Sequence, residues 1–117
     1  MVFKFLFGLL LAIATHQSLS PRPLEVFQHS PDKFLHVLCW GVLSAALYLA
    51  FRYTGRYRTL LICLFIYSVI LEIAQLWVPG RFLDAGDVVS NAVGCLLIYG
   101  VTKLMEWRWP HLKIGQP

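Results

Sequence analysis

The chain has 117 residues, of which 58% are hydrophobic and only 14% are charged. A soluble domain usually carries about 25% charged residues, so this composition excludes an ordinary water-exposed surface and indicates a membrane protein. The net charge of +4 raises nucleic-acid binding as an alternative, but the basic residues separate apolar runs and form no basic helix, so we expect no nucleic-acid partner.

Four apolar runs follow one another along the chain. Each is close to the ~20 residues that a helix needs to cross ~30 Å of hydrocarbon, and no alternation of period two suggests a β-barrel. The sequence therefore predicts an all-α, integral membrane four-helix bundle in a single domain, residues 1–117, with helices over roughly 2–19, 34–51, 59–78 and 86–105.

The first run has an alternative interpretation as a cleaved signal peptide. Lys4 would supply the basic start, and Ala12-Ile13-Ala14 resembles a cleavage site. The hydrophobic segment would then be only about nine residues long, which is at the short end for a signal peptide. We therefore favour an uncleaved helix.

The basic residues predict the orientation in the membrane. With four spans, both termini and the middle loop lie on one side, and that side holds seven of the ten basic residues. They are Lys4, Arg52, Arg56, Arg58, Lys103, Arg108 and Lys113. Because basic loops stay inside, we expect both termini to be cytoplasmic.

The three cysteines, Cys39, Cys63 and Cys95, all lie inside apolar runs. Their spacing fits no zinc motif, so we interpret them as small apolar packing residues.

Nine polar residues that are unusual in membrane helices fall on the side opposite to the basic one. They are Asp32, Lys33 and His36 at the start of the second helix, Glu72 and Gln75 near the end of the third, Arg81 in the loop that follows, and Asp84, Asp87 and Asn91 at the start of the fourth. These residues share one depth, and an ionisable group at mid-bilayer costs ~2.5–3.5 kcal/mol unless it faces the bundle interior or water. We therefore expect them to form one site.

The residue types suggest a division of roles within this site. We assign catalytic roles to Glu72, Asp87, His36 and Asp84, and substrate contacts to Asp32, Lys33, Gln75, Arg81 and Asn91. Carboxylate oxygens suit Mg²⁺ or Mn²⁺, so Glu72, Asp84 and Asp87 are candidate ligands for a divalent cation. Lys33 and Arg81 can clamp a phosphate, and His36 can serve as acid or base.

The same residues also have structural explanations. Asp84 and Asp87 can cap the fourth helix and complement its dipole. Gln75 and Asn91 can form interhelical hydrogen bonds. The two cations, Lys33 and Arg81, can extend to the interface, and His36 can bond to Asp32. Glu72 has no basic residue one turn away on its own helix, so it needs a partner on another helix or a proton.

Small residues predict close helix packing. Gly86, Ser90 and Gly94 recur every four residues on the fourth helix, and Gly41 and Ala45 form a similar pair on the second. Such a stripe lets backbones approach within the bundle or between copies in a homo-oligomer.

Three blocks of these residues resemble the VanZ-like family. Asp32-Lys33-Phe34-Leu35-His36 resembles its DKxxH signature. Glu72-Ile73-Ala74-Gln75 followed by Pro79-Gly80-Arg81 resembles its ExxQ…PxR block, and the segment from Asp84 to Gly94 resembles its DxxDxxxNxxG block. The resemblance implies a small bacterial envelope protein, similar to proteins linked to low-level teicoplanin resistance. From this resemblance together with the predicted spans and orientation, we expect a multi-pass protein of the bacterial cytoplasmic (inner) membrane, with its polar site facing outside.

Three functions fit these observations. The first is an enzyme acting on a lipid or lipid-linked head group, with membrane lipids, a lipid-linked phosphate or a cell-wall precursor as partners. The second is a non-enzymatic envelope protein that binds such a molecule or a partner protein. The third is a small proton-coupled transporter using Glu72, for which four short helices are few.

Overall fold

The computed structural model describes residues 1–20, 32–80 and 83–113, and within them it is built from helices. The long helices are α1 (Val2–Leu19), α3 (Asp32–Phe51), α4 (Tyr57–Ala74) and α5 (Ala85–Arg108), with short 3₁₀ turns at Arg52–Thr54, Gln75–Trp77 and Pro110–Lys113. All four long helices are long and apolar enough to cross a membrane. The predicted all-α bundle of four membrane-spanning helices is therefore confirmed.

The helix ends differ slightly from the predicted ones. α3 and α5 continue beyond the apolar runs, whereas α4 ends before the run does. α3 begins at Asp32 and α5 continues to Arg108. α4 ends at Ala74, and the 3₁₀ turn Gln75–Trp77 carries the chain to the end of that span.

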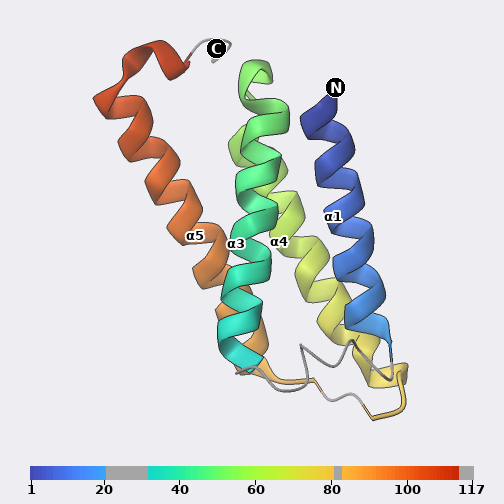
Figure 1. Ribbon diagram of the computed structural model, residues 1–117. Coiled ribbons are helices and arrows are strands. Elements are labelled where there is room, and N and C mark those ends of the chain that lie inside the picture. The colour runs from blue at the N-terminus through green and yellow to red at the C-terminus, as the bar shows by residue number, and fades with distance from the viewer. Residues whose placement is uncertain (21–31, 81–82, 114–117) are drawn as a thin grey trace.

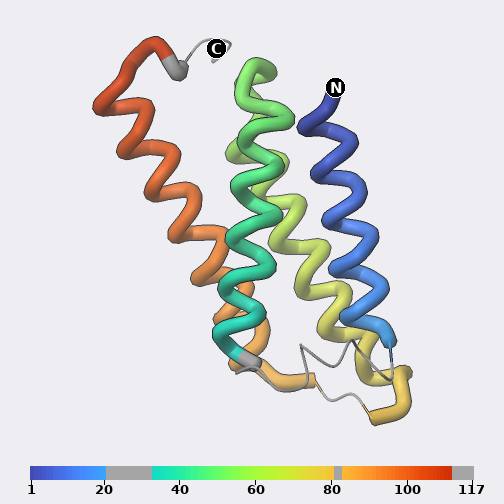
Figure 2. The backbone as a smooth tube through the Cα atoms, viewed as in Figure 1, coloured from blue at the N-terminus to red at the C-terminus, as the bar shows by residue number. Residues whose placement is uncertain are grey.

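Consecutive helices run in opposite directions (Figure 1). The start of α1, the end of α5 and the connection between α3 and α4 lie at one end of the bundle (Figures 1 and 2). The starts of α3 and α5 and the end of α4 lie at the other, which we call the site end. This arrangement places the described members of the polar group and of the basic group identified in the sequence at opposite ends.

Several polar side chains are buried inside the bundle, while many large apolar side chains are exposed on its exterior, unlike in a soluble protein. Ser44, Ser68, Glu72, Asn91 and Glu106 are all at most 3% exposed. Large apolar side chains are exposed on every helix, as on α1 and α5, where many face outward. Lipid would cover such an exterior without cost, so the pattern supports a membrane location.

The apolar core lies mainly between α3, α4 and the middle of α5. Trp40, Leu43 and Leu47 of α3 pack with Leu61 and Leu71 of α4. α1 contributes a single buried residue of its own, Ala14, so it is attached at the edge of this core.

The cysteines divide into two kinds. Cys95 is buried in the core, as predicted for a packing residue, whereas Cys39 and Cys63 are exposed. The prediction of an interior packing role is therefore wrong for Cys39 and Cys63, because an apolar run in a membrane helix has a lipid-facing side as well as an inner one.

α3 and α5 approach most closely where Gly94 meets the backbone of α3. A Cβ atom at Gly94 would lie 2.6 Å from the Val37 carbonyl oxygen and 2.9 Å from the Gly41 amide nitrogen. Only a residue without a side chain fits there, as the small-residue stripe of α5 predicted.

Replacing Gly94 with alanine should therefore destabilise the bundle. The added methyl group forces α3 and α5 apart, at a cost of about 1–3 kcal/mol. Thermal unfolding of the purified protein in detergent measures the effect. Gly100→Ala is the matched control, since nothing lies within 4 Å of a Cβ at that position of the same helix. Equal melting temperatures for the two variants would contradict this account of the contact.

Candidate functional site

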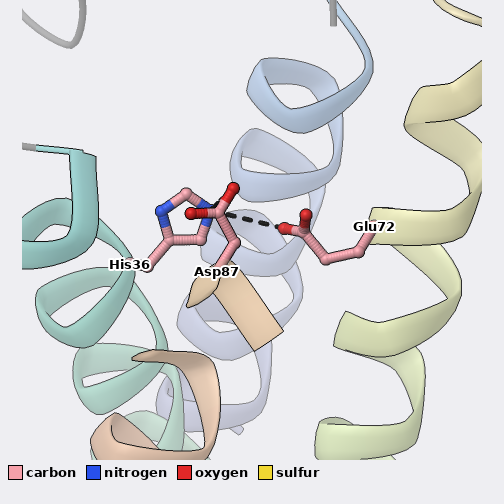
Figure 3. A group of neighbouring side chains, drawn as sticks. All are labelled: His36, Glu72 and Asp87. Carbon is pink, nitrogen blue, oxygen red and sulfur yellow. Dashed lines mark ion pairs between the residues drawn. The ribbon is translucent and has the colours of Figure 1, made fainter. Parts of the chain in front are cut away.

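Three side chains from three helices meet at the site end. His36 lies one turn into α3, Glu72 lies in the last turn of α4, and Asp87 lies in the first turn of α5. Each helix positions its residue at the same depth, because α3 and α5 begin where α4 ends. Figure 3 shows the three side chains pointing toward one another.

The His36 ring is the centre of this group. Its Nε2 atom lies 3.3 Å from Glu72 Oε1 and 3.7 Å from Asp87 Oδ2. Glu72 is 3% exposed and Asp87 6% exposed. Glu72 thus has the partner on another helix that the sequence required, and a protonated His36 would offset part of the carboxylate charge.

Lys33 forms a second layer toward the outside of the bundle. Its ammonium lies 2.5 Å from Asp84 Oδ2 and 2.6 Å from Asp87 Oδ1, so it bridges the two aspartates of α5. The prediction that Lys33 simply extends into the interface is incomplete, because this residue links α3 to the start of α5.

Asp84 caps α5, as the sequence suggested. Its Oδ1 atom accepts a 2.8 Å hydrogen bond from the Gly86 amide. The Lys33 ammonium, together with this amide, holds the pKa of Asp84 below its usual range. The structure thus places Asp84 on Lys33 and the helix terminus, beside the group of three, and its predicted role as a metal ligand stays a prediction.

Gln75 connects the site end to α1. Its Nε2 donates a 2.9 Å hydrogen bond to the Ser18 carbonyl oxygen. This is the interhelical bond that the sequence offered as one explanation, although its partner on α1 carried no signal in the sequence.

Asn91 lies one turn below Asp87 on α5, about 6 Å deeper at 1.5 Å per residue. It is 0% exposed, and within the described part of the chain neither atom of its amide has a hydrogen-bond partner. The Oε2 atom of Glu72 is likewise buried and has no hydrogen-bond partner among the described residues. Buried polar atoms in proteins are nearly always hydrogen-bonded, so these groups mark a position inside the bundle that suits a polar ligand or water.

Two predicted site residues receive no structural account. Arg81 lies outside the described residues, and so does the side chain of Asp32 at the start of α3. Their predicted substrate contacts, and the alternative bond between Asp32 and His36, stay predictions.

The group of three matches the donor set of a metal site. One nitrogen of His36 and one oxygen each of Glu72 and Asp87 lie within 4.8 Å of one another. Ligand atoms bound about 2.0–2.2 Å from a tetrahedral ion lie about 3.3–3.6 Å apart, close to the two His36 distances. An octahedral Mg²⁺ site would need about 3.0 Å and favours oxygen alone.

Charge favours a cation as well. The described side chains bring the three carboxyl groups of Glu72, Asp84 and Asp87 close to the Lys33 ammonium and the His36 ring. Such a concentration of carboxyl groups suits a divalent cation. The imidazole among the donors suits Zn²⁺ better than Mg²⁺, and the two carboxylates also suit Mn²⁺.

The helices and the site together define a multi-pass membrane protein with a buried His-carboxylate cluster at one end. The sequence pattern of the VanZ/LLP1 family matches residues 2–106, so the chain belongs to this family. Comparison with curated proteins and with solved structures found no significant match.

The lowered pKa of Asp84 predicts a pH-dependent contribution to stability. The ionised carboxylate stabilises the folded protein above its unfolded pKa, near 4, and this contribution is lost as pH falls through the lower folded pKa. Asp84→Asn keeps a capping side chain but removes the charge. Its melting temperature should be below that of the wild type at pH 6, and the difference should shrink below pH 4. A difference that is constant with pH would contradict the pairing with Lys33.

Proposed function

We propose that this protein binds and acts on the phosphate-bearing head group of a lipid or lipid-linked molecule at the outer surface of the bacterial cytoplasmic membrane. The observation that carries the proposal is the meeting of His36, Glu72 and Asp87 at one end of four membrane-spanning helices. Buried charges are expensive in a membrane and usually mark a functional site. Their depth near a helix end matches the level of lipid head groups.

A divalent cation held by His36, Glu72 and Asp87 would explain the composition of this group. Three protein ligands leave further coordination positions for a substrate oxygen. A cation there would neutralise and polarise a phosphoryl group. The protein itself would orient the head group through Lys33, and through Arg81 as the sequence suggests. His36 would instead be the acid or base if the cation is held by carboxylates alone.

The outward orientation of the site is part of the proposal. Lys4, Arg52, Arg56, Lys103 and Arg108 lie at the end opposite the site, on the elements grouped there in Figure 1. The positive-inside rule makes that end cytoplasmic. The site would then act on the outer leaflet, where a changed lipid or precursor would alter tolerance to teicoplanin.

A non-enzymatic binding protein is the second candidate. Asp84 and Asp87 both pair with Lys33, so these carboxylates are less available for a reaction. This arrangement favours a site that binds a head group without changing it chemically. Lipid analysis separates the two candidates, as described below.

Purified wild-type protein should bind about one Mn²⁺ or Zn²⁺ ion per chain. Removing a ligand by Glu72→Gln, Asp87→Asn or His36→Ala should weaken binding by about tenfold or more, because each replacement takes one donor from the group. Glu106→Gln is the matched control, since Glu106 is a buried carboxylate of α5 near the other end of that helix. Equilibrium dialysis with metal analysis measures the binding. Metal binding that survives all three ligand variants would place the ion elsewhere.

Cells expressing the wild type should differ in one membrane lipid or lipid-linked precursor from cells without the protein. Glu72→Gln and Asp87→Asn should abolish the difference at equal expression, because they remove the proposed acidic ligands. Mass spectrometry of lipid extracts measures this, and teicoplanin tolerance is scored in the same strains. A tolerance change without any lipid change would favour the binding protein, and activity that survives loss of both carboxylates would rule out the enzyme as proposed.

A further inference from the structure

An apolar groove of about 340 Å³ lies between α1 and α3. Its walls are formed by Leu10, Ile13 and Gln17 of α1 and by Leu35, Cys39 and Val42 of α3, among others. Ile13 and Val42 are 47% and 46% exposed, and Cys39 is also exposed. The groove is therefore open along its side to whatever surrounds the helices, which for membrane-spanning helices is lipid.

The groove reaches the polar cluster at one residue of the group of three, His36. His36 and Gln75 line it, and so do Gln17 and Ser18 at the end of α1. All four lie toward the site end, whereas the deeper lining is apolar apart from Cys39. One end of the groove thus opens at the ring that contacts Glu72 and Asp87, and the other end leads into the hydrocarbon region.

The depth of the groove corresponds to part of one leaflet. From Ser18 to Leu10 the α1 wall spans eight residues, or about 12 Å at 1.5 Å per residue. A hydrocarbon core of ~30 Å has leaflets of about 15 Å. The groove therefore ends within the leaflet on the side of the site end.

We infer that this groove holds one fatty acyl chain of a lipid whose phosphate-bearing head group lies at His36, Glu72 and Asp87. The inference rests on the proposed function and narrows its substrate class to acyl lipids. The groove would hold a large part of a linear acyl chain, whereas a polyprenyl carrier is several times longer, carries regular methyl branches and would lie mostly outside the groove. An acyl chain is solvated by surrounding lipid as favourably as by the groove, so the groove adds little binding energy. Contacts to the head group therefore determine which lipid binds, and the groove determines where its acyl chain lies.

The test uses phosphatidylglycerol with a photoactivatable diazirine near the middle of one acyl chain, in phosphatidylcholine vesicles containing the full protein. Adducts are mapped by mass spectrometry. In the wild type they should concentrate on residues 10–18 and 35–43. Adducts spread equally over exposed positions of α4 and α5, such as Ile66 and Leu97, would overturn the inference.

Two exposed cysteines provide a matched pair of variants. Cys39→Trp fills the groove, whereas Cys63→Trp adds the same bulk to α4, outside the groove lining. Overpacking costs about 1–3 kcal/mol, so groove adducts should fall about fivefold or more in Cys39→Trp and stay unchanged in Cys63→Trp. Ile13→Trp, on the opposite wall, is the second groove variant if Cys39→Trp does not fold. Equal labelling of groove and control variants would overturn the inference.

Two further measurements separate this inference from the proposed function. Glycerol phosphate, a head group without a chain, should bind equally to the wild type and Cys39→Trp but not to Glu72→Gln. If it fails to bind the wild type, the proposed head-group site is wrong and the substrate assignment falls with it, even where groove adducts form. If undecaprenyl phosphate with the same photoreactive group labels the groove and phosphatidylglycerol does not, the head-group site stands and the acyl assignment is wrong.

Discussion

The close approach of α3 and α5 at Gly94 is the contact on which the rest of the site end depends. It brings the α5 backbone against Val37 and Gly41 of α3. Lys33 and His36 precede these two residues, near the start of α3. They therefore lie opposite Asp84 and Asp87. A side chain at Gly94 would widen this gap, and ion pairs of 2.5–3.7 Å between the two helices would lengthen with it.

The membrane explains why α4 must complete the group. Glu72 is a buried carboxylate in an apolar helix, and without His36 nearby its ionised form would have no compensating charge among the described residues. Water can solvate such a group in a soluble protein, but hydrocarbon cannot. The position of α4 is therefore tied to the α3 and α5 pair by charge compensation as well as by the apolar core.

Much of this arrangement could be predicted from the sequence, because helix length and residue number fix depth along the membrane normal. Depth placed His36, Glu72 and Asp87 at one level. Rotation about each helix axis is not fixed in the same way, so the sequence could not show that Asp84 pairs with Lys33, as it does in the structure. The bond to Ser18 could not be predicted from the sequence, because Ser18 contributes only its backbone carbonyl. The burial of Glu106 could not be predicted either, because this residue lies in a polar helix end.

The edge position of α1 has a mechanical consequence. Apolar contact in a bilayer gains little over contact with lipid tails, so a helix with one buried residue is held chiefly by its polar bonds. The polar bonds of α1 include the Gln75 bond to the Ser18 carbonyl and the 2.6 Å bond between Thr15 and Tyr67. Loss of these bonds would therefore loosen α1, and its displacement would open the bundle sideways, within the plane of the membrane.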